Sequence, residues 1–318
     1  MRTLKNLKMN ATILAVVLLG FAACGLAQQA ETKVLARNVI GLENVKPNSS
    51  GTLTVQNGAM QFDTGSTAAK IPIASIEDIV VGSETTQAGG KTGTVVKTAA
   101  MAAPFESGKT LSLLLRTNVD ILTVAYRDAG GGLHFAVLAL PKGQGEEERA
   151  QLLTSGARAS AAGDKQKLNP AAPPAPTPDG QKLSASAIQI EPVEAGDVQI
   201  PIEFRAAIYE FLVQRVRDAG TFKQVFRSGD GAAAGVPDLV SLHTTVEKFK
   251  QGSQMERETT TVMGGTKVDV SASVTARDGR TVLANTVEGN VRFRGENLGV
   301  TKDLSKHVAK LLRKNFGS

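Results

Sequence analysis

The chain has 318 residues and a formal net charge of +6, from 36 Lys and Arg against 30 Asp and Glu. It has no Trp and two Tyr, so it lacks the interleaved basic and aromatic residues of nucleic-acid-binding surfaces. Its single Cys excludes a disulfide within one chain, and its length predicts two domains.

Residues 1–27 have the pattern of a secretory signal peptide. Basic residues precede a largely apolar run over residues 11–23, and small residues follow it up to Ala27. The run is shorter than the ~20 residues that a membrane-spanning helix needs. We therefore expect export, to the periplasm or to an outer-membrane-associated position. Removal of Arg2, Lys5 and Lys8 from the 36 basic residues would leave 33 against 30 acidic residues, a mildly basic protein.

Cys24 leaves two processing outcomes open. Cleavage after Ala27 would discard it, whereas lipoprotein processing would make it an acylated first residue and anchor the protein to a membrane. We favour ordinary cleavage, because Phe21 stands where a lipoprotein signal usually has Leu. Cys24 is the candidate lipid-attachment site.

Residues 28–158 are predicted to form a β-rich domain that ends in one helix. Leu53 and Val55 alternate with polar residues up to Asn57-Gly58, a two-residue hairpin signal before a return strand. An acidic turn at residues 146–148 favours the start of a helix whose Ala150, Leu152 and Leu153 would face the sheet. The other predicted strands are 70–73, 76–81, 111–116, 120–127 and 133–140, with a Gly turn at 130–132.

This half resembles PH-like and GRAM-type domains. The segment Lys70-Ile71-Pro72-Ile73-Ala74-Ser75-Ile76-Glu77-Asp78-Ile79 is similar to a strand, short turn and strand of those domains, and the likeness covers about residues 34–158. The resemblance implies a seven-stranded β-barrel with a C-terminal helix, and a binding or adaptor surface rather than catalysis. The sequence offers no compact Lys/Arg cluster for a phosphoinositide headgroup.

Residues 159–185 are predicted to form a Pro-rich linker. Its central run, Asn169–Pro178, has almost nothing to bury and favours an extended, semi-rigid conformation. The composition predicts two modules that are held apart.

Residues 186–318 are predicted to form an α-β-β-β-β-α domain, so the fold class of the whole chain is α+β. Apolar residues at helical spacing predict a first helix over 201–219, which Gly220 ends. In a last helix, Leu304, Val308, Leu311 and Leu312 would point inward and a row of basic residues outward. The four strands are predicted at 222–227, 239–249, 266–277 and 281–294.

This half resembles a family of uncharacterised bacterial envelope lipoprotein domains, similar to the N-terminal domain of TolB and to the curli-secretion lipoprotein. The likeness covers roughly residues 186–316 and implies a part in envelope assembly, transport or scaffolding. The residues that carry it are Arg217-Asp218-Ala219-Gly220-Thr221-Phe222, Pro237-Asp238-Leu239-Val240, Phe249-Lys250-Gln251-Gly252 and Val274-Thr275-Ala276-Arg277-Asp278-Gly279-Arg280-Thr281-Val282.

Two glycine-rich segments imitate nucleotide-binding motifs. The segment 229–234 fits the dinucleotide pattern G-x-G-x-x-A, but Pro237 and a strand follow where the motif needs a helix, so we expect a mobile loop. Gly89-Gly90-Lys91-Thr92 matches the end of a P-loop, yet Thr85 stands where the first glycine belongs. We expect no nucleotide and no cofactor.

The residues of catalysis and metal binding form no recognisable local motif. His134, His243 and His307 are widely spaced, with no second His at ligand spacing, and consecutive acids at 146–148 would diverge on a helix. We therefore predict no catalytic residue and no metal site, and interpret His134 and His243 as surface or hydrogen-bonded packing residues. A triad assembled from distant residues stays open.

Together these observations predict an exported, non-enzymatic envelope protein that acts as an interaction or scaffolding module. An envelope protein is the expected partner. The basic face of the last helix leaves contact with a membrane surface open. A lipid-binding or lipid-trafficking protein is the alternative, and a hydrolase with a site built from distant residues is the weaker one.

Overall fold

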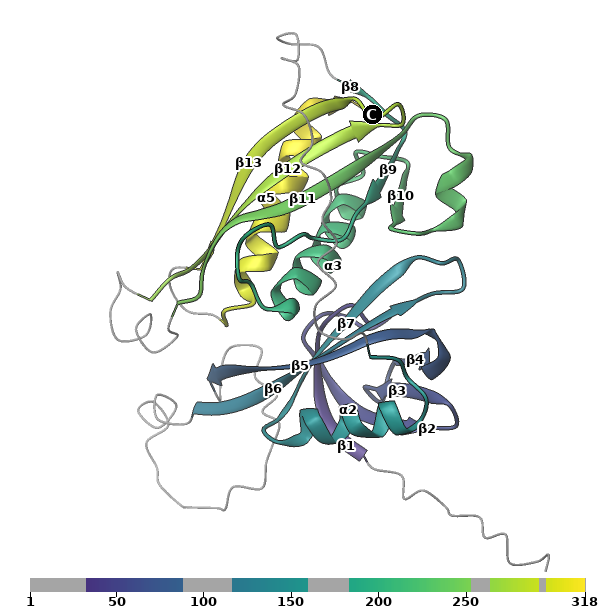
Figure 1. Cartoon of the computed structure of the whole chain (residues 1–318), viewed down its shortest axis with the longest axis vertical. Coiled ribbons are helices and arrows are strands. Elements are labelled where there is room, and N and C mark those ends of the chain that lie inside the picture. Colours follow the sequence, from purple (N-terminus) through teal and green to yellow (C-terminus); the bar gives the residue numbers. More distant parts are fainter. Residues whose placement is uncertain (1–32, 88–115, 160–182, 253–263, 292–295, 318) are drawn as a thin grey trace, which may run out of the picture. The chain divides into compact units, whose positions relative to one another are not determined.

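The computed structural model describes residues 33–87, 116–159, 183–252, 264–291 and 296–317, which form an α+β fold dominated by two sheets (Figure 1). In these residues no helix has both the length and the apolar character needed to cross a membrane. The signal peptide with Cys24, the glycine-rich segment 89–92, the Pro-rich run and most of the strand predicted at 111–116 lie outside the described residues.

The first sheet, called here the N-terminal sheet, has seven antiparallel strands in the order β4-β3-β2-β1-β7-β6-β5. It is not closed into a barrel, because β4 and β5 are its edges and the short turn η1 separates them. Its elements are β1 (Lys33–Ile40), β2 (Ser49–Gln56), β3 (Ala59–Asp63), β4 (Ala68–Pro72), η1 (Ile73–Ser75), β5 (Ile76–Gln87), β6 (Arg116–Arg127), β7 (Leu133–Pro141) and then α2 (Gln144–Thr154).

The β2–β3 hairpin confirms the turn predicted from the sequence. Asn57 and Gly58 form its two-residue loop, with φ of 50° and 69°, and Gln56 pairs with Ala59 across it. Positive φ at both central residues is the geometry that matches the twist of the flanking strands, and Asn-Gly is the sequence that adopts it most readily.

Helix α2 packs on the N-terminal sheet, but partly through residues other than those predicted. Leu152 is fully buried and Leu153 packs against the core, as expected, whereas Ala150 is exposed. The buried face instead includes Gly145 and Glu148. A side chain at Gly145 would lie 2.8 Å from atoms of β5 and β6, so the helix approaches the sheet closely only because glycine stands there.

The second sheet, called here the C-terminal sheet, has five strands in the order β10-β9-β11-β12-β13. The predicted α-β-β-β-β-α order is present, but the sheet gains β9, which lies parallel between β10 and β11. The elements are β8 (Leu183–Ser184), β9 (Ala187–Ile190), α3 (Ile202–Ala219), β10 (Gln224–Arg227), η3 (Gly231–Gly235), β11 (Leu239–Lys250), β12 (Thr266–Ala276), β13 (Thr281–Val291), α5 (Gly299–Asn315) and β14 (Phe316–Gly317).

The C-terminal sheet has an apolar face and a polar face. Along β12, Val268, Val270, Ala272 and Val274 are 0–1% exposed, while alternate residues are polar, as the period-two pattern predicts. Helix α5 packs across β12 and β13 and also against α3 (Figure 1). The helices therefore cover the apolar face.

Residues 33–318 form one compact unit, whereas the Pro-rich composition predicts separated modules. One hydrophobic cluster joins Val39, Ile121 and Val137 of the N-terminal sheet to Phe204 and Ile208 of α3. The reason lies in α3, which is buried on nearly all sides and so needs a covering layer on two faces. Its buried residues are Glu203, Phe204, Ala206, Ala207, Ile208, Tyr209, Glu210, Phe211, Leu212, Val213 and Val216.

Candidate functional site

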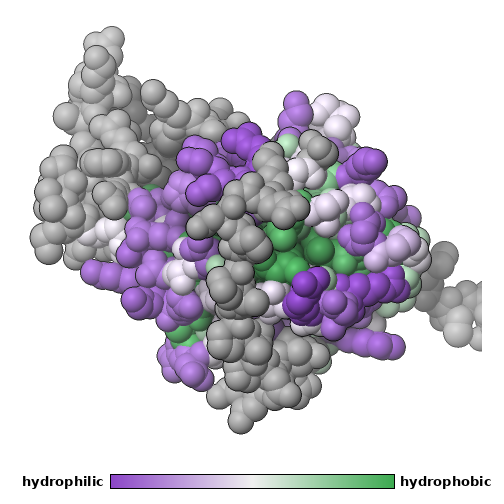
Figure 2. Space-filling view, turned by 90° about the horizontal axis from the view of Figure 1, so that it is seen from above, coloured by the Kyte–Doolittle hydropathy of each residue, from purple (hydrophilic) through white to green (hydrophobic). Residues whose placement is uncertain are grey.

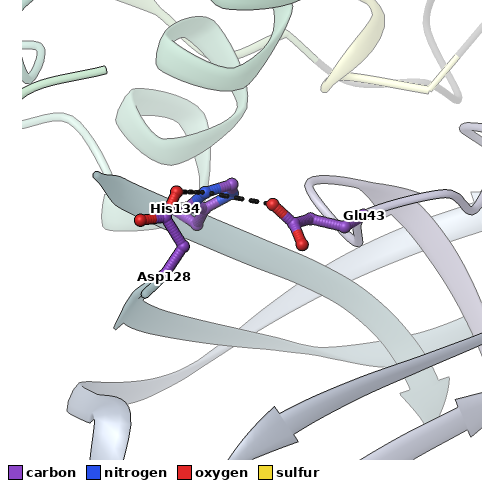
Figure 3. A group of neighbouring side chains, drawn as sticks. All are labelled: Glu43, Asp128 and His134. Carbon is purple, nitrogen blue, oxygen red and sulfur yellow. Dashed lines mark hydrogen bonds and ion pairs between the residues drawn. The ribbon is translucent and has the colours of Figure 1, made fainter. Parts of the chain in front are cut away.

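The one group of potential metal ligands in the described residues is Glu43, Asp128 and His134, whose ligand atoms lie within 4.8 Å of one another. Asp128 follows β6 and His134 lies in β7, so the hairpin brings them together, and Glu43 approaches from the β1–β2 connection (Figure 3). His134 Nε2 is 2.9 Å from Asp128 Oδ2 and 3.4 Å from Glu43 Oε1. Glu43 is the exposed member.

The Asp128 carboxylate is fixed by the glycine turn that follows it. Its Oδ1 accepts hydrogen bonds from the amides of Gly130 (2.8 Å) and Gly132 (2.9 Å), which leaves Oδ2 for the histidine. Burial raises the pKa of this carboxyl, but the hydrogen bonds from His134, Gly132 and Gly130 together outweigh it, and the pKa is lowered. Asp128 is therefore an ionised acceptor.

The His134 ring is held in one orientation and one tautomer. It is 3% exposed and stacks on Tyr126 with ring centroids 4.9 Å apart. A carboxylate can only accept, so Nε2 must carry the proton that it donates to Asp128. Nδ1 is buried and has no hydrogen-bond partner among the described residues. The surroundings therefore favour the imidazole with its proton on Nε2.

This tautomer bears on what the cluster can do chemically. One imidazole and two carboxylates suit a divalent transition metal, but a metal at Nε2 would displace its proton to Nδ1. Nδ1 would then be a buried donor without an acceptor, at a cost of about 1–3 kcal/mol. The geometry therefore favours a structural role, in which the His134–Asp128 hydrogen bond holds the β6–β7 turn. It disfavours a metal centre. Of the two positions that the sequence leaves open for His134, surface or hydrogen-bonded interior, the structure shows the second.

A second charged cluster lies where α3 meets the N-terminal sheet. Glu210 of α3 accepts two hydrogen bonds of 2.8 Å from the Arg227 guanidinium, one at each oxygen, and Oε1 also accepts from the amide of Phe135 in β7 at 2.8 Å. Burial lowers the pKa of Arg227, but the adjacent Glu210 carboxylate outweighs it and raises the pKa. The two side chains are paired and largely out of water.

Tyr209 extends this cluster into a network between the two sheets. Its hydroxyl donates to the Leu133 carbonyl and accepts from the Ser228 amide, both at 3.1 Å, and burial raises its pKa to about 12. Arg227 donates to the same Leu133 carbonyl at 3.0 Å, and the Leu133 amide donates to the Ser228 carbonyl at 2.9 Å. We call Tyr209, Glu210 and Arg227 the junction network.

The glycines of segment 229–234, which fits the dinucleotide pattern, have a structural role. The predicted loop contains a five-residue turn, η3, which begins at Gly231, and Gly231 donates to the Gly130 carbonyl at 3.0 Å; β11 follows the turn. A side-chain carbon at Gly131 would lie 2.8 Å from the Gly229 carbonyl oxygen. Glycine is needed at the crossing because two backbone segments touch.

The remaining predicted residues lie apart from both clusters. His243 faces Thr275 Oγ1 at 3.1 Å on the polar side of the C-terminal sheet, and His307 of α5 donates to the Glu288 carbonyl at 2.8 Å. The structure does not bring the three histidines together. Glu43, Asp128, Glu210 and Arg227 were not predicted from the sequence. Only Asp128 had a local signal, since it and His134 flank a hairpin turn.

The described surface is marked by charge more than by apolar area. Leu35, at 50%, is the one large hydrophobic side chain that is exposed in the described residues. On the face drawn in Figure 2, apolar areas are bordered by hydrophilic residues. In contrast, α5 presents a row of exposed cations, called here the basic stripe, which consists of Lys302, Lys306, Lys310, Arg313 and Lys314. None of these five residues forms an ion pair within the described residues.

Comparison with known proteins identifies no family. No family model matches the chain, and no curated protein matches it. Among solved structures, a PelC dodecamer from Paraburkholderia phytofirmans is 14% identical, with a TM-score of 0.33, and covers 44% of this chain and 94% of its own. A point variant of that dodecamer is 15% identical, with a TM-score of 0.31, and covers 44% of this chain and 94% of its own. The hypothetical protein CT253 from Chlamydia trachomatis is 10% identical, with a TM-score of 0.26, and covers 41% of this chain and 92% of its own.

Proposed function

We propose that the chain is an exported, non-enzymatic protein of the cell envelope that acts as an interaction or scaffolding module in assembly or transport. The junction network is the observation that carries the proposal. A scaffold must hold its surfaces in a fixed relation, and a buried, fully hydrogen-bonded ion pair between two layers disfavours other arrangements. In this chain, the network ties α3 and β10 to β7.

We infer further that the N-terminal sheet is an opened relative of the PH-like fold. Seven antiparallel strands followed directly by one helix support this, although the sheet has two edges where a barrel would have none. The order of α3, β10 to β13 and α5 likewise supports kinship with the envelope lipoprotein domains of the TolB type. Both relationships would place binding surfaces, rather than a reaction centre, in this protein.

The expected location is the periplasm or the outer membrane, with Cys24 as the anchor if it is acylated. Mass measurement of the mature protein separates the two outcomes. A Gln28 start would establish the unanchored form, and a lipid-modified Cys24 the anchored one. A full-length chain in the cytosol with its leader attached would contradict export.

A pull-down tests the interaction role. Tagged mature protein, cross-linked in intact cells and purified from detergent-solubilised envelopes, should recover the same envelope component repeatedly. An Arg227→Met variant that is exported and soluble should recover less of it, because the junction loosens. Capture of no component by folded wild type would overturn the proposal. Co-purification of a stoichiometric lipid would favour the lipid-trafficking alternative instead.

A further inference from the structure

The basic stripe is unusual for the solvent face of a helix because it has one sign. Exposed helix faces commonly mix acids and bases at i,i+4 spacing, where opposite charges support the helix and like charges oppose it. Here Lys302, Lys306, Lys310 and Lys314 are like-charged neighbours at that spacing, and all are exposed. The arrangement therefore works against the stability of α5.

The first lysine of the stripe, Lys302, also opposes the helix dipole. The last turn holds Arg313 and Lys314, where cations are favourable, so these two have a structural explanation. The first turn contains no acid, and its Leu298 cap makes no side-chain hydrogen bond. Lys302 lies near this positive end of the helix. The stability of α5 therefore does not explain why a lysine stands at position 302.

The one acid near the start of the stripe is already engaged elsewhere. Asp303 Oδ2 accepts a hydrogen bond from the Asn290 amide of β13 at 3.1 Å and lies 3.9 Å from His307 Nδ1. Asp303 and His307 thus bind the edge of β13 rather than the stripe, since His307 donates to the Glu288 carbonyl. The five cations are left for a group outside the described residues.

The geometry of the stripe indicates a narrow partner. Lys302, Lys306, Lys310 and Lys314 follow one another at steps of four residues, so they form a single ridge that runs obliquely to the helix axis with a rise of ~6 Å per step. The apolar side chains of α5, such as Leu304, Val308 and Leu312, are buried in the core and cannot insert into a membrane. A broad anionic surface would also meet the Asp303 carboxylate beside the row.

From these observations we propose that the basic stripe of α5 binds an acidic protein segment, whose carboxylates repeat at one helical turn or at alternate residues of an extended chain. This proposal rests on the proposed interaction role and names its surface and the chemistry of its partner. Contacts of this kind are formed between exposed charges, so binding is weakened by salt. A nucleic acid is disfavoured, because both Tyr side chains are buried and no aromatic residue is exposed in the described part of α5.

Charge reversal with a matched control tests the proposal. The mature full chain is titrated into a fluorescent fifteen-residue poly-Glu peptide at low salt, and anisotropy is recorded. Lys302→Glu, Lys306→Glu and Lys310→Glu together should weaken binding roughly ten-fold or more. The control, Lys70→Glu, Lys142→Glu and Lys248→Glu, makes the same change of net charge at exposed sites elsewhere and should weaken binding far less. Equal losses in the two triples would overturn the proposal.

A single variant separates binding from folding. Lys302→Glu should raise the melting temperature, since it places an acid in the first turn, yet it should weaken peptide binding. Loss of both would indicate a structural role for Lys302 and contradict the proposal. Stripe-dependent binding to phosphatidylglycerol vesicles or polygalacturonate, without peptide binding, would overturn it in favour of those partners. If the pull-down recovers its component equally well with the stripe triple, the inference fails and the proposed function stands.

Discussion

The two long helices of the C-terminal half pack on the same sheet but use charge in opposite ways. Helix α3 buries Glu203 and Glu210, and the latter is paired with Arg227. Helix α5 buries only apolar and small polar residues and keeps its cations exposed. Buried charge is costly unless it is paired and hydrogen-bonded, and once paired it restricts geometry. We interpret α3 as the element that fixes the structure and α5 as the one left free for a partner.

The largest expected effect comes from breaking the junction network. Arg227→Met leaves the Glu210 carboxylate buried without its partner, which should cost about 3–5 kcal/mol of unfolding free energy in urea titrations. Adding Glu210→Gln should restore part of the loss, because the remaining group is neutral. The control is Arg217→Met, the same change at an exposed position of α3, the helix that carries Glu210. A loss below about 1 kcal/mol would show that the pair does not hold the layers together.

Glu148 is a buried carboxyl that, unlike Glu210, has no cation paired with it in the described part of the chain, so removing its charge should stabilise the fold. Burial, followed by the charge of Glu147, raises the pKa of Glu148 to about 7, and its Oε2 has no partner among the described residues. The folded state then holds the proton more tightly than the unfolded one, so stability falls as pH rises from about 4.5 to 7. Glu148→Gln should gain on the order of 2 kcal/mol at pH 8 and little at pH 4. For the exposed control Glu247→Gln, the change in unfolding free energy should not depend on pH. The same independence of pH for Glu148→Gln would refute the raised pKa of Glu148.

A smaller effect on stability is expected where the loop at Gly131 crosses the loop at Gly229. Gly131 and Gly143 have nearly the same φ, 87° and 89°, but only Gly131 has backbone within 4 Å of a would-be side chain. Both Ala variants bear the cost of positive φ, so their difference isolates the close approach. Gly131→Ala should lose about 1 kcal/mol more than Gly143→Ala in chemical denaturation. Equal losses would mean that the loops do not touch.

The smallest expected effect concerns the Glu43, Asp128 and His134 cluster. Because His134 is expected to keep its Nε2 proton on Asp128, a tenfold excess of Zn²⁺ over protein should shift the melting temperature by less than about 1 °C. His134→Gln should lower stability without changing this response. A zinc-induced rise that disappears in His134→Gln would establish a metal site and reverse the tautomer argument.

Much of the fold could be predicted from local patterns. Asn57-Gly58 fixed one hairpin, the alternation along β12 gave its buried face, and Gly220 ended α3 with a φ of 62°. Four strands were missed, namely β1, β9 and the two-residue strands β8 and β14. β9 has four residues, too few for a clear period, and the alternation of β1 weakens after Ala36.

The association of the two halves could not be inferred from the linker, but α3 contained a signal. A helix whose buried residues occur on nearly every side needs a cover on both sides, and this pattern outweighs the Pro-rich composition nearby. Barrel closure is different, because strand count does not determine whether β4 and β5 pair. The pairs Glu210–Arg227 and Glu43–His134 join distant positions, so no spacing in the sequence indicates them.

The account depends most on the contact between α3 and β7, and the Phe135 amide reports on it directly. This amide donates to the Glu210 carboxylate of the other half of the chain at 2.8 Å. In hydrogen exchange by NMR, it should be protected to a degree similar to the neighbouring amides of the β6–β7 ladder, and Arg227→Met should reduce that protection. Exchange of the Phe135 amide in the wild type at the rate of an exposed amide would contradict the account.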